Sequence, residues 1–210
     1  MAATIITVAQ QKGGAGKTTL VAHLATAWAA SGLRVALVDI DPQHSLAGWY
    51  ALRGSRDGVT LDLHEIPGYR LAAALGRLAA DYDIVLIDSP PHAETEARIA
   101  VRVADLALVP VQPSPMDLWA TRPTLDLAVA EKTPALVVLN RVPPRANLTE
   151  TVGAALKDYA VPVARTRLGS RVAYAASLLE GKGVTEFAPS SRAADEIGKL
   201  AREVLRTAGR

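Results

Sequence analysis

The chain has 210 residues, half of them hydrophobic, with 23 basic against 21 acidic side chains. It contains no cysteine, which suits a reducing compartment and excludes proteins that hold an iron–sulfur cluster through thiolates. No cleavable leader and no run of about eighteen apolar residues is present, so neither secretion nor membrane spanning is indicated and we expect a cytoplasmic protein. The length and the apolar content suffice for the core of a single domain over residues 1–210.

Short apolar runs alternate with stretches of helical pattern along the chain. This alternation is typical of repeated βαβ units, in which helices join parallel strands and cover the sheet. We therefore expect an α/β fold with a mostly parallel, twisted sheet flanked by helices. The strand-like runs occupy residues 4–9, 34–39, 83–88, 105–111 and 134–140.

A glycine-rich segment directly follows the first of these runs. Its glycines allow successive backbone N–H groups to face an anion, and the helix that opens near Thr18 adds the positive end of its dipole. At this spacing Lys17 reaches the β- and γ-phosphates of a nucleoside triphosphate, and the Thr18 hydroxyl binds Mg²⁺. Gln11 stands where the ordinary P-loop pattern has glycine, so the strand, loop and helix context identifies the motif. The predicted nucleotide contacts in this segment are Lys12, Gly13, Gly14, Ala15, Gly16, Lys17, Thr18 and Thr19.

Acidic residues stand where the second and third apolar runs end. Asp39 closes the second run and Asp41 follows it, and strand alternation places both carboxylates on one side, facing the phosphate loop. Asp88 closes the third run, as in a Walker-B strand, and two prolines after it set the path of a loop able to sense the γ-phosphate. Acids gathered at this edge need a cation, so we predict that Asp88 supports Mg²⁺ together with Thr18.

The presence of both Lys12 and Lys17 makes the loop resemble that of the deviant Walker-A ATPases of the ParA and MinD family. The resemblance implies a slow, partner-stimulated ATPase that forms an ATP-bound homodimer, in which Lys12 reaches the nucleotide of the other subunit. It also implies that Asp39 holds a Mg²⁺-bound water, that Asp41 orients or deprotonates the attacking water, and that Asn140 faces the adenine. The predicted catalytic residues are Lys12, Lys17 and Asp41, and the predicted metal site is Thr18, Asp39 and Asp88.

The resemblance extends over nearly the whole chain, since the segment 174–189 also looks like small ParA proteins. There is no room before the first strand for a helix-turn-helix domain, so operator-specific repression is not expected. One departure is Ser89, where the family usually has threonine, but the hydroxyl group is kept. We therefore expect a small ParA-type partition or cargo-positioning protein.

Basic residues are concentrated in the C-terminal part of the chain. Residues 1–140 carry 11 basic and 14 acidic side chains, whereas residues 141–182 carry 7 basic and 3 acidic ones. A solvated basic face is the alternative, but ParA proteins bind chromosomal DNA as ATP dimers. The resemblance therefore favours nonspecific duplex DNA, contacted through its phosphates, and a place on the nucleoid. The predicted DNA contacts are Arg141, Arg145, Arg165, Arg167, Arg171 and Lys182.

The last predicted helix carries an apolar stripe flanked by basic residues, a pattern that a MinD-like membrane-surface helix would also show. The stripe lacks aromatic residues and has acidic neighbours, so packing against the sheet is favoured. A metabolic ATP-dependent ligase on the same scaffold and a nucleotide-set scaffold with negligible turnover are further alternatives. The implied partners are a ParB-like or other adaptor and a plasmid, a chromosome or a protein cargo. The stripe consists of Ile197, Leu200, Ala201, Val204 and Leu205.

Overall fold

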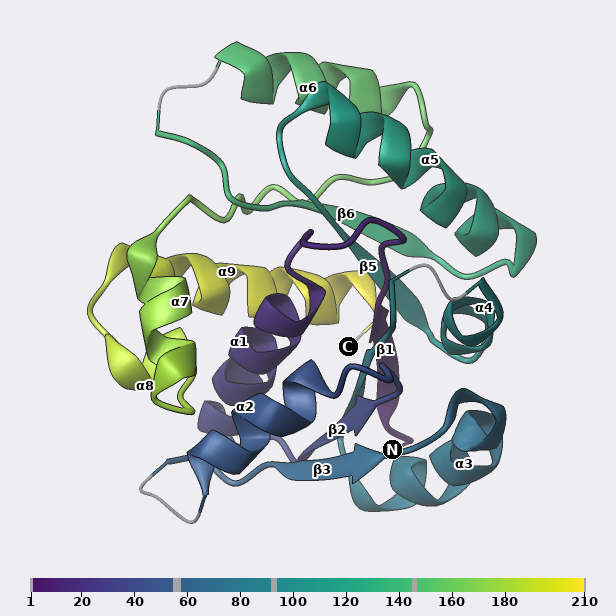
Figure 1. Ribbon diagram of the computed structural model, residues 1–210, viewed down its shortest axis with the longest axis vertical. Coiled ribbons are helices and arrows are strands. Elements are labelled where there is room, and N and C mark those ends of the chain that lie inside the picture. Colours follow the sequence, from purple (N-terminus) through teal and green to yellow (C-terminus); the bar gives the residue numbers. More distant parts are fainter. Residues whose placement is uncertain (1, 55–57, 92–93, 145–146, 210) are drawn as a thin grey trace.

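The computed structural model describes residues 2–54, 58–91, 94–144 and 147–209 (Figure 1). Its centre is a six-stranded sheet in the order β3-β2-β4-β1-β5-β6, in which every neighbouring pair is parallel. The strands are β1 (Thr4–Val8), β2 (Val35–Asp39), β3 (Asp62–Glu65), β4 (Ile84–Asp88), β5 (Leu106–Val111) and β6 (Ala135–Leu139).

Five of these strands confirm the five apolar runs, and the expected parallel α/β fold is confirmed with them. β2, β4 and β5 are buried at every position, as is usual for parallel strands covered on both faces. The sequence did not reveal β3, which has four residues and lies at the edge of the sheet. Its end residues Asp62 and Glu65 are exposed, so it lacks the continuous apolar run of the others.

Helices cover both faces of the sheet (Figure 1). On one face α1, α2, α7, α8 and α9 share a core with alternate strand residues, and on the other face α3 to α6 pack against the remaining ones. The helices are α1 (Lys17–Ala30), α2 (Ser45–Arg53), α3 (Leu71–Asp81), α4 (Glu94–Arg102), α5 (Pro115–Ala130), α6 (Asn147–Lys157), α7 (Val172–Leu179), α8 (Val184–Phe187) and α9 (Arg192–Thr207), with a 3₁₀ turn at Gly68–Arg70.

The segment between α6 and α7 runs alongside β6 and covers the free edge of that strand. Val137 and Val163 form one parallel bridge, and Val142 and Gly169 form another. Further backbone hydrogen bonds join this segment to β6 between the two bridges. In one of them the N–H of Leu168 donates to the carbonyl of Leu139 at 2.9 Å. Because these bonds use the polar groups of β6, the edge is not open to another chain there.

The apolar stripe of the last helix packs into the core, as the sequence predicted. Ile197, Leu200 and Val204 of α9 are fully buried, and the indole N–H of Trp28 in α1 donates to the Ala201 carbonyl at 3.1 Å. Ser191 caps the helix by accepting from the N–H of Ala194. This packing disfavours a membrane-surface role for the stripe, because most of its apolar side chains are buried in the core. In the described residues, no helix has the length and apolarity to cross a membrane.

Substitution Ile197→Ala should lower the free energy of unfolding by about 2–5 kcal/mol, because it leaves a cavity between α9 and α1. Urea unfolding followed by circular dichroism measures this change. Arg202→Ala, on the exposed side of the same helix, is the matched control and should change stability by about 0.5 kcal/mol or less. Equal stability of the two variants would contradict the core position of the stripe.

Candidate nucleotide-binding site

Parallel pairing brings the carboxyl ends of β1, β2 and β4 to one edge of the sheet. Asp88 lies opposite Val8 in one pairing and opposite Asp39 in the other. The glycine-rich loop leaves β1 at this same edge and leads into α1, which begins at Lys17. Loop, carboxylates and helix start therefore converge, which is the usual ligand-binding edge of an open α/β sheet.

The glycine-rich loop is fixed by hydrogen bonds from residues that directly follow β5 and β6. Gly14 and Gly16 have φ angles of +76° and +92°, which favour glycine. The side-chain amide of Gln112 donates to the Gly14 carbonyl at 3.0 Å, and that of Asn140 donates to the Ala15 carbonyl at 2.9 Å. A Cβ at Gly16 would lie 2.6 Å from Asn140 Nδ2. The N-cap residue of α1 is Gly16, which has no side chain to cap the first turn, so the N–H groups there suit an anion.

Lys17 is buried beneath this loop. The residue is 7% exposed, and Nζ donates to the Gln10 carbonyl at 3.0 Å. Burial lowers the pKa of Lys17 below its usual value, and the nearby Asp88 and Asp41 oppose that shift. It lines a cavity of about 450 Å³ that extends past Thr18 and Asp41 and along α2. A buried ammonium beside a cavity of this size fits a phosphate chain.

Asp88 and Thr18 meet under the loop in a geometry that fits a divalent cation. The Thr18 hydroxyl donates to Asp88 Oδ2 at 2.7 Å, whereas Asp88 Oδ1 is buried with no hydrogen-bond partner in the described residues. Burial raises the pKa of Asp88 to about 7. Hard oxygen ligands of this kind are what Mg²⁺ takes, and a cation would compensate the unpaired carboxylate oxygen. The Ser89 hydroxyl, by contrast, is already bonded to the Val8 carbonyl at 2.8 Å.

Asp39 and Asp41 lie beside this pair. The Asp39 carboxylate accepts from the N–H groups of Asp41 at 2.9 Å and Ala47 at 3.1 Å. Burial raises the pKa of Asp39, and these two N–H groups oppose that shift. Because both Asp39 oxygens are occupied by N–H groups, this carboxylate suits a water in the cation's shell better than the cation itself. Asp41 accepts from the N–H of Gln43 and lines the cavity.

Lys12 does not point into the cavity. Its Nζ lies 2.6 Å from Oδ2 of Asp117, in the first turn of α5, and the Ser114 hydroxyl donates to the same oxygen. The Lys12 side chain is 36% exposed and that of Asp117 is 6% exposed. The sequence offered no signal for Asp117, because it lies about a hundred residues from the loop.

Comparisons with known proteins agree with this geometry. The model of the CobQ/CobB/MinD/ParA nucleotide binding domain matches residues 6–184. The chain belongs to this family. It is 33% identical to the maintenance of carboxysome distribution protein A of Halothiobacillus neapolitanus, with 95% of each chain covered. It is 29% identical to the chromosome-partitioning ATPase Soj of Thermus thermophilus, with 95% of this chain and 94% of that one covered.

Solved structures share the fold. MinD from Aquifex aeolicus superposes with a TM-score of 0.83 at 22% identity, covering 97% of each chain. An ATP complex of a Cyanothece McdA variant superposes with a TM-score of 0.80 at 18% identity, covering 99% of this chain and 97% of that one. The resemblance to the ParA and MinD family expected from the two lysines is thus confirmed.

In this ParA-like chain, Asn140 and Arg141 follow β6 and lie beside the glycine-rich loop. Both line a second cavity of about 250 Å³, together with His23 and Tyr174, and Arg141 also lines the phosphate cavity. Arg141 has a φ angle of +51°, and its N–H donates to the Asn140 side-chain oxygen at 2.9 Å. Of the six residues predicted to bind DNA, Arg141 is therefore the one that lines both of these cavities among the residues that the structure describes. The sequence could have indicated this place, because Arg141 directly follows Asn140, which was predicted to face the adenine.

The other predicted DNA contacts do not form one free cationic patch. Arg167 pairs with Glu150 at 2.7 Å, Arg171 pairs with Glu196 through two hydrogen bonds, and Lys182 pairs with Glu180 at 2.9 Å. Arg165 is exposed and has no ion pair with any residue that the structure describes. Arg145 lies outside the described residues.

The pKa of Asp88 predicts a pH dependence of the stability of the metal-free protein. Its folded pKa of about 7 lies above the ordinary value of 3.8, so the carboxyl stabilises the fold when protonated and this contribution is lost as pH rises through about 7. The difference in unfolding free energy between Asp88→Asn and the wild type should therefore shift by about 2 kcal/mol in favour of the variant when the pH rises from about 5 to about 8. Urea unfolding in chelator at both pH values measures this shift. Parallel curves would show that Asp88 ionises without cost.

Proposed function

We propose that the protein is a ParA-type ATPase that binds Mg·ATP, dimerises, binds DNA nonspecifically and positions a cargo by hydrolysing ATP. The observation that carries this proposal is the cavity lined by Lys17, Thr18 and Asp41, with Asp88 bonded to Thr18 beneath it. The second lysine, Lys12, and the similarity to proteins of the ParA group support it. Residues 1–210 would act as one ATPase domain.

Each residue at the cavity has a task in this proposal. The loop from Gly13 to Gly16 holds the phosphates through backbone N–H groups, and Lys17 balances their charge. Thr18 and Asp88 hold Mg²⁺, and Asp39 accepts from a water in its shell. When bound, Mg²⁺ neutralises charge that develops on the phosphate oxygens. Thr19 is the next residue of the cradle and lines both cavities.

Asp41 orients the attacking water, because its carboxylate lines the phosphate cavity while its backbone is fixed by the turn into α2. Asn140 contacts the base in the second cavity, where it also supports the loop through the Ala15 carbonyl. Arg141, which borders both cavities, is close enough to the nucleotide to contribute to its binding as well as to DNA.

Lys12 acts on the nucleotide of the other subunit. In the single chain its ammonium is bound to Asp117, so the lysine must leave that carboxylate before it can cross an interface. The Lys12 side chain is 36% exposed although Asp117 is buried, so its ammonium is open to solvent on one side and can exchange this carboxylate for ATP phosphates in a second copy. Dimerisation is thereby coupled to the presence of ATP.

Two relatives named as maintenance of carboxysome distribution protein A favour a protein assembly as cargo. Relatives named for chromosome partitioning and as ParA keep a plasmid or a chromosome as alternatives. An adaptor protein would stimulate a slow basal hydrolysis, and DNA binding would place the dimer on the nucleoid. The buried stripe of α9 disfavours a membrane surface as the track.

Lys17→Ala should weaken ATP binding by at least about tenfold, because the phosphates lose a charged hydrogen bond. Lys12→Ala should keep its affinity for ATP yet stay monomeric. Equilibrium binding of a fluorescent ATP analogue, followed by light scattering with Mg·ATP, measures both properties. Wild-type protein with Mg·ADP is the monomeric control. An ATP-bound dimer of Lys12→Ala would contradict the role of this lysine across the interface.

Binding to nonspecific duplex DNA should require Mg·ATP and should weaken with salt, since phosphate contacts release counterions. Arg165→Ala should lower the salt slope by about one, the effect of losing one phosphate contact. A salt series in Mg·ATP and Mg·ADP measures this, and Arg77→Ala, exposed on α3, is the control that should match the wild type. Absence of binding in both nucleotides would remove DNA as the track and leave the ATPase proposal in place.

A further inference from the structure

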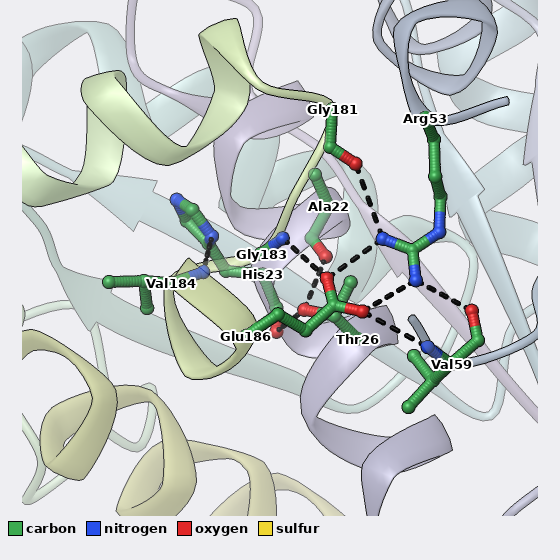
Figure 2. Close-up of polar contacts among 9 residues, drawn as sticks. All are labelled: Ala22, His23, Thr26, Arg53, Val59, Gly181, Gly183, Val184 and Glu186. Carbon is green, nitrogen blue, oxygen red and sulfur yellow. Dashed lines mark hydrogen bonds and ion pairs between the residues drawn. The ribbon is translucent and has the colours of Figure 1, made fainter. Parts of the chain in front are cut away.

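Arg53 and Glu186 form an ion pair beside the nucleotide site that is almost wholly buried (Figure 2). Arg53 is the last residue of α2, and Glu186 belongs to α8. Their side chains are 9% and 13% exposed. Guanidinium Nη1 donates to Oε2 at 2.8 Å and Nη2 donates to Oε1 at 2.5 Å, so the pair is bidentate and its geometry is fixed.

Backbone groups of two further segments complete the cluster. Glu186 also accepts from the N–H of Val59 at 3.1 Å and of Gly183 at 2.8 Å, while Arg53 donates to the carbonyls of Val59 at 2.6 Å and Gly181 at 3.2 Å. Burial alone would raise the pKa of Glu186, but the bonds from Arg53 and the backbone hold it below its usual value. The pair therefore joins α2, the segment before β3 and the turn between α7 and α8.

This turn lies directly on α1 and α2, with no room to shift. A Cβ at Gly181 would lie 2.4 Å from the backbone nitrogen of Arg53, and a Cβ at Gly183 would lie 1.8 Å from the Thr26 hydroxyl oxygen. On the α1 side, His23 Nδ1 accepts from the N–H of Val184 at 3.1 Å (Figure 2). The close fit makes the turn a rigid support for the end of α2.

The opposite end of α2 adjoins the catalytic carboxylates. The helix starts at Ser45, four residues after Asp41, and its Ala47 N–H bonds to Asp39 at 3.1 Å. Its inner side lines the phosphate cavity, and so does the end of α7, which leads into the turn. A nine-residue helix is a stiff rod, so fixing one end limits where the other end lies. The lining residues are Ser45, Trp49 and Leu52 from α2, and Leu178 and Leu179 from α7.

We propose that Arg53 and Glu186 are positioning residues for ATP hydrolysis, which hold α2, and with it Asp41, at a fixed place relative to α7. The inference rests on the proposed ATPase function. Arg53 is not a phosphate ligand, because its terminal nitrogens already make four hydrogen bonds inside the cluster. Loss of the pair should therefore affect the hydrolysis step, which depends on Asp41, more than nucleotide binding, which depends on the loop.

Glu186→Gln tests the proposal, since it keeps the size of the side chain and removes its charge. We expect the single-turnover rate at saturating Mg·ATP to fall about ten- to a hundredfold, as small displacements of a catalytic group do. The dissociation constant of a fluorescent ATP analogue should change by less than about threefold, which is smaller than the expected fold-change in the rate. Both are measured well below the melting temperature of the variant, which is recorded in parallel.

Two further variants keep the test decisive. Arg53→Lys retains the charge opposite Glu186 but not the fork, so it should fold and show a smaller loss of rate in the same direction. Glu131→Gln is the matched control, because Glu131 is 12% exposed and pairs with Arg98 between α5 and α4, away from the cavity. It should lower the melting temperature without changing the rate.

The outcomes distinguish failure of the positioning role from failure of the ATPase function. A wild-type rate in folded Glu186→Gln and Arg53→Lys, with only a lower melting temperature, would overturn the positioning role and leave the ATPase standing. An equal loss in Glu131→Gln would also overturn it. If wild-type protein released no more phosphate than Lys17→Ala, with or without DNA, the ATPase function itself would be wrong.

Discussion

The burial of charged groups at one edge of the parallel sheet is the constraint on which the site depends. Lys17 and Asp88 are both held where water is scarce, so burial works against the charged form of each. The two groups partly compensate each other, but burial remains the largest cause of both pKa shifts. A phosphate chain and a divalent cation would supply further counter-charge to both, so ligand binding and folding stability are linked at this edge. The sheet brings these charged groups together, because β1, β2 and β4 end side by side at one edge.

Two ion pairs lie near the cavity, and they differ in how far their side chains are exposed. In the first pair the Lys12 side chain is 36% exposed, so water and a competing anion can reach its ammonium, although the Asp117 carboxylate is buried. Arg53 and Glu186 are enclosed, and removal of one partner would leave a buried charge without compensation. The first pair suits a contact that is exchanged in each cycle of dimerisation. The second suits a fixed support that stays in place while the nucleotide changes.

Much of this architecture could be predicted from the sequence, because parallel strands are continuous apolar runs and the phosphate loop has a distinctive spacing. The runs that became β1, β2 and β4 also located Asp39 and Asp88 correctly at neighbouring strand ends. β3 was missed, since an edge strand needs no continuous apolar run. Asp117 and Glu186 were missed for a different reason: each meets its partner across more than a hundred residues, and nothing local marks such a contact.

The basic C-terminal region shows the limit of counting charges. Positive residues in a sequence predict an anion-binding face only if their side chains are free in the fold. Here Arg171 is bonded to Glu196 and Tyr174 lies against the same carboxylate, so this arginine joins α7 to α9. Arg165, by contrast, is exposed. Its backbone N–H, and not its guanidinium, donates to the Glu203 carboxylate. Composition could not distinguish these two arginines, whereas their packing does.

The hydrogen bond from the Ser89 hydroxyl to the Val8 carbonyl has a consequence for movement at the site. It clamps the end of β4 to the end of β1, one residue beyond Asp88. The backbone directly beyond Ser89 is stiffened by Pro90 and Pro91. These constraints limit movement at the end of β4, so Asp88 keeps its place beside the end of β1.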